Sequence, residues 1–322
     1  MIPKEFSDYF SSRNADQQKQ IIDELLHLVM PYENIPESED AVVLKCPYCR
    51  SNEIRGNGKL KTMPRYVCKE CNKHFSQSTG KFWYALKKRD LINKYMFCLV
   101  AGYSIRKSAE ITGISIQTSF DWRHKLLTSF ATIFPLSFQG IVEVNDFAFQ
   151  YSEKGKRQID KEKLDKSNKQ VAVVATCDRS GREDLRVVKT DSLSNEDIVS
   201  VLQGRLQSVE LLVSQNHTNY NSLKERLKID HKTSGGSKRQ KQTEKLYHIQ
   251  NINNMYIRLV NFMSPFHGVA TKYLQNYMNW FLMLEKIRDS TRKIATIARI
   301  ALSTDRAWHN YKSKNINIFL RT

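Results

Sequence analysis

Four cysteines in the first quarter of the chain have a type and spacing that could do metal chemistry. Cys46 and Cys49 form one Cys-x-x-Cys pair, Cys68 and Cys71 form a second, and eighteen residues separate the two pairs. Four thiolates in two such pairs suit a tetrahedral Zn²⁺ site, which is structural because no ligand position is left open for catalysis. Two accidental pairs, or a redox pair, are the alternatives. The spacing predicts a zinc ribbon over residues 41–80.

A second set of polar residues lies in the β-prone stretch from Gly140 to Gln150. The two-residue period of a strand places Glu143 and Asn145 on one face and Asp146 on the other. A buried polar side chain is costly unless it is paired, protonated or bound to a metal. We therefore expect the first, central strand of a mixed α/β domain, with polar side chains at its middle.

The elements after this strand predict a mixed sheet flanked by helices. Further strands are expected at Gln170–Thr176, Asp184–Lys189, Glu210–Ser214 and Ile229–His231, and helices at Ser194–Leu206, Tyr220–Leu227 and Glu244–Phe262. This order is that of a ribonuclease H-like domain, which we place at 140–285, ahead of a basic C-terminal helical tail at 286–322. Fold class alone gives no function.

The segment between the ribbon and the sheet, residues 87–130, predicts a helical bundle. Its expected helices are Leu91–Val100, Ser104–Thr112 and Ser115–Leu127, with the two serines as N-caps and Gly113 as the turn. Two helices joined by such a turn are typical of a DNA-binding helix-turn-helix, and a plain three-helix bundle is the alternative. The side chains of the third helix that could contact DNA are Gln117, Thr118, Arg123 and Lys125. Residues 1–40 are expected to be a helical segment without chemistry.

The overall charge indicates a polyanionic partner. The 322 residues carry a formal net charge of +18 and the pI is near 9.6, which favours nucleic acid over a membrane surface. No apolar run approaches the roughly 20 residues of a membrane span, and cysteines paired in this way favour a cytoplasmic protein. The basic stretch Thr233–Lys245 is predicted to contact DNA through Lys238, Arg239 and Lys241.

Several motifs that occur in one order give the chain a family resemblance. They are Val142–Val144 ahead of an acidic-type pair, Tyr151–Arg157 with a Ser-x-Lys-Gly turn, Ser214–Tyr220 with His217, Asn253 in the long helix, and Phe266–Leu274. Together they resemble bacterial insertion-sequence transposases with an N-terminal zinc ribbon, a helix-turn-helix and a ribonuclease H-like DDE domain, of the branch whose catalytic set is Asp-Asp-Asn-Lys. The resemblance implies DNA transposition with Mg²⁺, double-stranded DNA with terminal inverted repeats as partner, a homo-oligomer on DNA and a nucleoid location.

The catalytic positions of that family are mostly changed in this chain. Asn145 and Gln215 stand where the family has Asp, Val260 stands where it has Lys, and only Asn253 is retained. Paired Mg²⁺ ions need hard, anionic oxygen ligands, whereas each amide offers one neutral carbonyl. The resemblance therefore implies a DNA-binding protein that has lost strand transfer, with structural Zn²⁺ as its cofactor.

Two other functions stay open from the sequence. In the first, Glu143, Asp146 or Asp178 takes over metal ligation and the chain is an active Mg²⁺-dependent transposase. Asp146 is an imperfect substitute, because it should point away from the face of Asn145. In the second, the chain is a zinc-ribbon scaffold whose positive charge binds RNA or other proteins.

Overall fold

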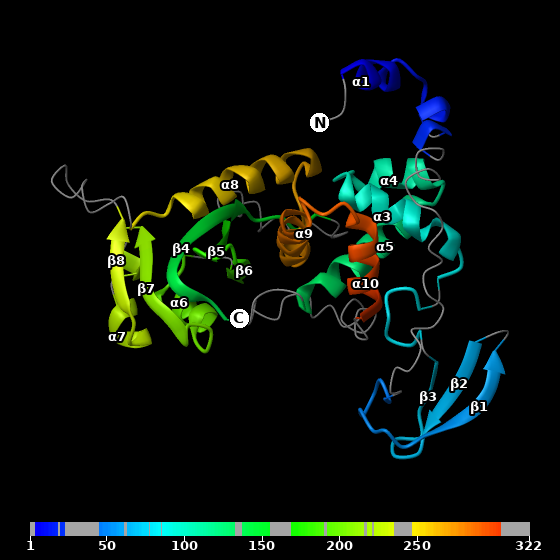
Figure 1. The fold of residues 1–322 in the computed structure, drawn as a ribbon, viewed down its shortest axis with the longest axis horizontal. Coiled ribbons are helices and arrows are strands. Elements are labelled where there is room, and N and C mark those ends of the chain that lie inside the picture. Colours follow the sequence, from blue (N-terminus) through cyan, green and yellow to red (C-terminus); the bar gives the residue numbers. More distant parts are fainter. Residues whose placement is uncertain are drawn as a thin grey trace, which may run out of the picture.

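The computed structural model of the chain has a small antiparallel sheet, a group of helices and a larger mixed sheet flanked by helices (Figure 1). This is the predicted α/β architecture. The residues that the structure describes are 4–18, 20–22, 45–60, 63–76, 78–84, 86–132, 137–154, 169–189, 192–215, 218–220, 222–234 and 247–303.

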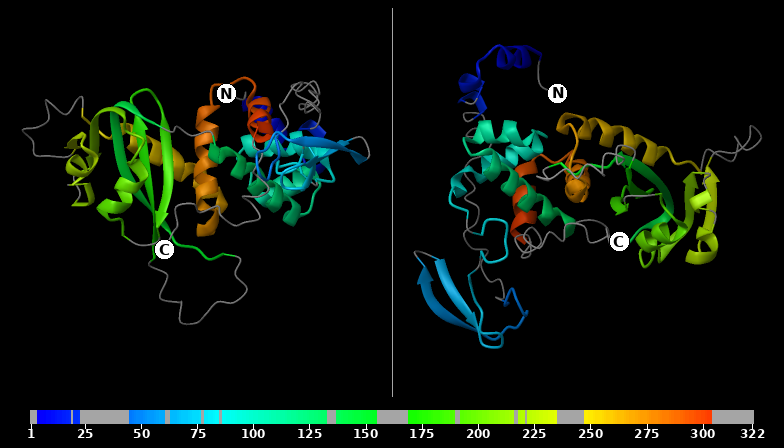
Figure 2. Two further views of the ribbon diagram at one scale, coloured as in Figure 1. Left: turned by 90° about the horizontal axis from the view of Figure 1, so that it is seen from below. Right: turned by 180° about the vertical axis from the view of Figure 1, so that it is seen from behind.

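The small sheet has three antiparallel strands in the order β1–β2–β3. Their bounds are Ile54–Leu60 for β1, Met63–Cys68 for β2 and His74–Ser76 for β3. Its small buried core consists of Cys46, Cys68 and Phe75. The sheet projects away from the rest of the molecule in Figure 1 and in the right-hand view of Figure 2, and its buried residues form a cluster of their own.

The helical group contains α3 (Ile92–Val100), α4 (Ile105–Thr112), α5 (Ile116–Ser129) and α10 (Lys293–Ser303), with α1 (Lys4–Ser11) beside it. Ser104 and Ser115 cap α4 and α5 by accepting backbone N–H groups of their first turns. Gly113 ends α4 in the left-handed conformation, with a φ of +67°. The predicted caps and turn are therefore confirmed.

The mixed sheet has five strands in the order β6–β5–β4–β7–β8. Their bounds are Gln139–Gln150 for β4, Gln170–Asp178 for β5, Glu183–Lys189 for β6, Ser208–Gln215 for β7 and Asp230–Ser234 for β8. The pairs β4–β5 and β5–β6 are antiparallel, whereas β4–β7 and β7–β8 are parallel. The predicted opening strand is thus the central one, as in a ribonuclease H-like domain.

Helices cover both faces of the mixed sheet. One face carries α8 (Gln250–Met263) and α9 (Leu274–Lys286), and the other carries α6 (Asn195–Leu202) and α7 (Leu223–Leu227). The helix α9 lies between the sheet and α5, and it is buried from Leu274 to Met283. One hydrophobic core therefore runs from β5 and β6 through α9 into the helical group, because α9 packs on both.

Three helices are shorter than the sequence pattern predicts. α7 begins at Leu223 rather than at Tyr220, which lies in a separate 3-10 turn, and the other two are α8 and α6. α8 begins at Gln250 rather than at Glu244, since 247–249 are not helical and 244–246 lie outside the described residues. α6 ends at Leu202 rather than at Leu206, because Gln203 is extended (ψ 135°) and Gly204 has a φ of +76°. Hydrophobic periodicity continues past both boundaries, so it could not locate either of them.

Single turns of 3-10 helix complete the described chain. They are η1 (Arg89–Leu91), η2 (Phe130–Thr132), η4 (Thr218–Tyr220), η5 (Ser264–Phe266) and η6 (Thr271–Tyr273). Among the described helices, none has the length and apolar character needed to cross a bilayer.

Candidate active-site face and metal cluster

The two amides at the changed catalytic positions lie on neighbouring strands. β4 and β7 run parallel, with Val144 opposite Ser214. Gln215, the last residue of β7, therefore lies next to Asn145, and the two side chains share a face. Asn145 is 7% exposed, whereas Gln215 is exposed. The fold thus brings the first two family positions together.

The other two family positions lie on α8, which crosses this face of the sheet (Figure 1). Asn253 and Val260 are on the exposed side of the helix with Tyr256, and the helical repeat places the three in one stripe. The Tyr256 ring lies against Phe147 of β4, with ring centroids 4.4 Å apart. Because Phe147 shares its face with Asn145, the stripe lies beside Asn145. We define the amide face as Asn145, Phe147, Gln215, Asn253 and Tyr256.

Glu143, one of the possible replacement ligands, is already engaged. Its Oε1 accepts a hydrogen bond from Asn251 Nδ2 (2.9 Å) and forms an ion pair with an Arg179 guanidinium nitrogen (3.1 Å). Its Oε2 accepts from the backbone N–H of Ile252 (3.1 Å). The carboxylate, 1% exposed, therefore neutralises the positive end of α8 and ties that helix to β4.

Asp146 points to the opposite face, as the strand period predicts. Its Oδ1 accepts a hydrogen bond from the Tyr220 hydroxyl at 2.7 Å. Burial raises the pKa of Tyr220, and the neighbouring Asp146 charge raises it further, so this phenol stays protonated as a donor. Asp146 therefore supports packing on the side of the sheet that carries α6 and α7, and it does not face Asn145.

Asp178 organises the turn between β5 and β6. Its Oδ1 accepts from the backbone N–H and the hydroxyl of Ser180 and from the backbone N–H of Arg182, at 2.9, 2.6 and 3.0 Å. Its Oδ2 accepts from the backbone N–H of Gln139 at 3.2 Å. It is paired with Val142 across the sheet, on the face opposite Asn145. Its carboxylate is thus a turn-forming group.

These placements decide whether the face fits a pair of Mg²⁺ ions. Mg²⁺ is bound by hard oxygens, and two-metal phosphoryl transfer needs carboxylates to balance the ions' charge. The described residues here supply the amides of Asn145, Gln215 and Asn253, with Val260 in place of a cation. The donor set therefore does not fit the two ions, and we derive no catalytic step through them.

The four cysteines, by contrast, form a compact cluster. All four Sγ atoms lie within 4.8 Å of one another, with Cys46 and Cys71 at 3.6 Å and Cys49 and Cys68 at 3.5 Å. Tetrahedral Zn–S bonds of about 2.3 Å require Sγ separations of roughly 3.8 Å, so the cluster could hold Zn²⁺. His74 of β3 forms a hydrogen bond with Asn57 and lies outside this cluster.

The predicted DNA contacts of α5 divide into exposed and buried residues. Gln117 is exposed and Thr118 is half-buried at the start of the helix, next to Ile116, which is 55% exposed. From Trp122 onward α5 is buried, because α4, α9 and α10 all pack against it. Only its first turn is available to a partner.

The prediction that Arg123 and Lys125 contact DNA is therefore wrong for this fold. Arg123 is fully buried; one guanidinium nitrogen donates to the Tyr103 carbonyl (2.6 Å) and the Ser108 hydroxyl (2.9 Å). Its guanidinium carbon also lies 4.8 Å from the Trp280 ring centroid. Lys125 is 6% exposed. Basic residues on a helix suggested a solvent-facing surface, but here they lie in an interface between helices.

Other sequence-based site predictions have no described geometry. Lys238, Arg239, Lys241 and His217 lie outside the described residues. Two contacts that shape the site leave no pattern in the sequence: the packing of the Phe147 and Tyr256 rings, and the hydrogen bonds of Glu143 to α8. Both depend on which part of α8 lies over β4, which becomes visible only in three dimensions.

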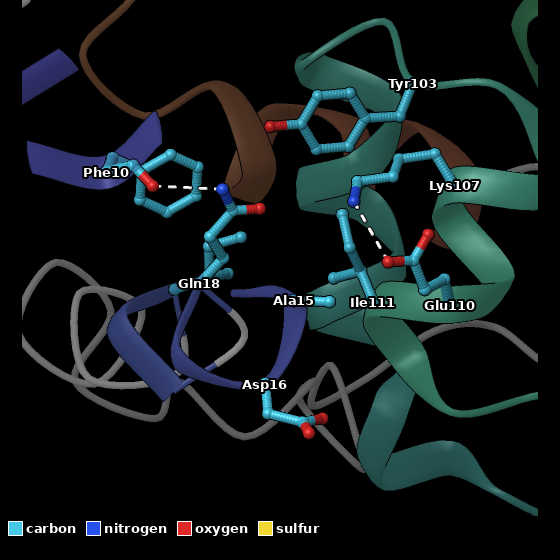
Figure 3. A pocket seen from close by; sticks show the side chains of 9 residues that line it. Phe10, Ala15, Asp16, Gln18, Tyr103, Lys107, Glu110 and Ile111 are labelled. Carbon is cyan, nitrogen blue, oxygen red and sulfur yellow. Dashed lines mark hydrogen bonds and ion pairs between the residues drawn. The ribbon is translucent and has the colours of Figure 1, made fainter. Parts of the chain in front are cut away.

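A hollow between the N-terminal segment and α4 includes none of the predicted site residues (Figure 3). Lys107 pairs with Glu110 at 3.1 Å, and Gln18 donates to the Phe10 carbonyl at 3.0 Å. Two of the polar side chains in the hollow thus pair with each other, and a third is bonded to the backbone. Its full lining is Phe10, Ala15, Asp16, Gln18, Ile22, Tyr103, Lys107, Glu110 and Ile111.

Comparison with known protein families finds a match for one part of the chain. Residues 137–282 match the model of the ISXO2-like transposase domain. A solved simian T-cell lymphotropic virus intasome in complex with the PP2A regulatory subunit B56 gamma is similar with a TM-score of 0.30 and 11% identity. That match covers 58% of this chain and 66% of the other chain. No curated protein matches the chain.

Proposed function

We propose that this chain, whose residues 137–282 form an ISXO2-like transposase domain, is a transposase-family protein that binds double-stranded DNA and has lost strand transfer. The domain match and the cysteine cluster fit an insertion-sequence transposase with a zinc ribbon. The finer statements, on DNA binding and on inactivity, rest on the residues discussed next.

One observation carries the proposed loss of activity. Both family aspartates are amides, Asn145 and Gln215, while the three nearby carboxylates are engaged elsewhere. Glu143 holds α8, Asp146 binds Tyr220, and Asp178 forms a turn. An active enzyme with relocated ligands would have to break one of these arrangements in order to bind metal. We therefore favour an inactive catalytic face.

The proposed DNA contact is the first turn of α5. In helix-turn-helix proteins the N-terminal residues of the second helix reach base edges in the major groove. Ile116 and Gln117 are exposed at that position, and Gln117 can pair with adenine while an apolar side chain can contact a thymine methyl group. The formal charge of +18 supplies attraction to the phosphates, with Lys238, Arg239 and Lys241 as further candidates.

The proposal includes a metal and an assembly. A Zn²⁺ ion bound by the four cysteines would fix the ribbon, because sites of this type contribute directly to folding. The protein would act as a homo-oligomer on terminal inverted repeats, which places it on the bacterial nucleoid. A scaffold that binds only proteins would not need the ordered set of transposase motifs.

Two measurements test this function. Duplex affinity should fall steeply as salt rises, because protein–phosphate contacts release counterions. The unmodified protein should produce no nicked DNA with Mg²⁺ or Mn²⁺ on inverted-repeat ends that it binds. Nicking that disappears in Glu143→Gln or Asp146→Asn would establish an active enzyme and overturn the proposed loss. Binding that does not respond to salt would overturn the duplex-binding part.

A further inference from the structure

We propose that the amide face binds an unpaired nucleobase at the end of a DNA strand. The idea rests on the proposed function, because it assumes a DNA-bound protein, and it assigns a ligand to a surface that no longer fits metal. Three features of the described residues support this proposal. They are an amide that has no hydrogen-bond partner, an exposed aromatic ring beside it, and the absence of an uncompensated charge on the side chains of the amide face.

The buried amide is Asn145. The residue is 7% exposed, and its side chain forms no hydrogen bond with any described residue. Neither atom of the amide is completely closed off from solvent, so the amide stays accessible to a ligand that approaches this face. Its neighbour Gln215, which is exposed, likewise has no side-chain hydrogen bond within the described part of the chain. Each amide offers two donors and an acceptor, so a ligand with a mixed donor and acceptor edge would satisfy both.

The aromatic ring is Tyr256 of α8. It lies against Phe147 at 4.4 Å with an interplanar angle of 31°, and 36% of the residue remains exposed. Exposed aromatic rings held in place by packing are the usual platforms on which unpaired bases stack. Because Phe147 is two residues from Asn145 on the same face of β4, one planar ligand could stack on the ring and reach the amides.

The charge of the face is compatible with a nucleic acid. Its side chains are neutral amides and aromatic rings, and the Glu143 carboxylate below them is compensated by Arg179 at 3.1 Å. The described face therefore offers no uncompensated carboxylate that would repel a phosphate backbone. Amide side chains pair with base edges, which carry donors and acceptors in one plane. The base must be unpaired, because in a duplex both of its faces are stacked and cannot lie on the Tyr256 ring.

The experiment compares three probes on the full-length protein at fixed salt. They are a blunt duplex, the same duplex with a short single-stranded 3′ overhang, and an abasic version of that overhang. The parent protein should bind the overhang duplex more tightly than the blunt one by about fivefold or more, the range for one stacked base. A 2-aminopurine placed in the overhang should lose fluorescence on binding, since stacking on a ring quenches it.

Three variants locate the effect. Tyr256→Ala and Asn145→Ala should each reduce the overhang advantage towards unity while leaving blunt-duplex affinity unchanged. Asn254→Ala is the matched control, because Asn254 is exposed on α8 but lies off the stripe of Asn253 and Tyr256, and its advantage should equal that of the parent. An overhang advantage that survives in Tyr256→Ala and Asn145→Ala, or that the abasic probe retains, overturns the inference. Loss of blunt-duplex binding with the overhang advantage intact instead overturns the proposed duplex binding and leaves this inference standing.

Discussion

The cysteine cluster and the amide face both lie where related proteins are expected to bind metal. They differ in the interactions that hold their side chains in place. In the cysteine cluster the four Sγ atoms lie within 4.8 Å, around a small core of Cys46, Cys68 and Phe75. The amide face, in contrast, is built on the central strand of a five-stranded sheet that has a hydrophobic core on each side. The ribbon therefore depends on its ligands for its shape, whereas the sheet depends on packing.

This difference explains how one set of ligands could be lost while the other stays complete. A ribbon of this size buries too few apolar side chains to fold without a metal or another crosslink. The sheet loses only metal affinity when Asp becomes Asn or Gln, because side chains of similar volume leave the packing intact. Changing one residue in each region tests this difference.

The largest effect is expected from Cys68→Ser. The parent should contain one Zn²⁺ per chain, and the variant should lose both the ion and the order of β1–β3, since apparent zinc binding in such sites contributes about 10–16 kcal/mol to local folding. Metal analysis and limited proteolysis of the ribbon measure this. Cys98→Ala, a change of a buried cysteine outside the cluster, should keep the ion. Absence of zinc from parent protein purified without chelators would contradict the prediction.

A smaller effect is expected from Glu143→Gln in the other region. Glu143 accepts two hydrogen bonds from the first turn of α8 and pairs with Arg179, so removing its charge should lower the free energy of unfolding by about 2–4 kcal/mol. Denaturant unfolding of the variant measures the loss. Asp230→Asn, which removes an exposed ion pair with Lys224, is the control and should have no measurable effect. If Mg²⁺ stabilises the parent but not Glu143→Gln, then Glu143 is a metal ligand. Both regions would in that case bind metal, and the proposed difference between them would be wrong.

Acid should weaken the interface that joins α5 to α9. His124 is buried against the ring of Tyr273, and burial first, then the nearby Arg123 and Lys272 charges, lowers its pKa to about 3. The unfolded histidine titrates near its ordinary pKa of 6.5, so this stability is complete above pH 6.5 and is lost as the pH falls towards 3. Between pH 6.5 and pH 5 the loss should reach about 2 kcal/mol.

Unfolding of parent and His124→Gln at several pH values measures this loss. The variant should lack this pH-dependent component, whatever its absolute stability. An equal slope in both proteins would show that other groups cause the acid sensitivity. The cysteine cluster is a useful reference, because its unfolding can be followed separately through zinc release.

Spacing and period were enough to predict much of this molecule. Two Cys-x-x-Cys pairs located the cluster, and the alternation along β4 placed Asp146 opposite Asn145, because both patterns depend on the chain alone. The burial of Arg123 could not be predicted, since it depends on α9, which is more than 150 residues away in the sequence. The start of α8 was also missed, because its first turn is fixed by Glu143 from a distant strand.

The smallest effect is expected at the proposed DNA contact, where two residues of α5 can be set against each other. Gln117 is exposed and bonds only to Asp121 among the described residues, so Gln117→Ala should leave stability unchanged and lower sequence-specific affinity roughly fivefold, the size of one lost base contact. Arg123→Ala should do the reverse. It leaves the Tyr103 carbonyl and the Ser108 hydroxyl without their partner in the interior, while the affinity per folded molecule stays the same. Anisotropy titrations with duplex DNA, paired with unfolding curves, separate the two effects. Reduced affinity in a fully folded Arg123→Ala protein would mean that α5 leaves its site against α9 when DNA binds.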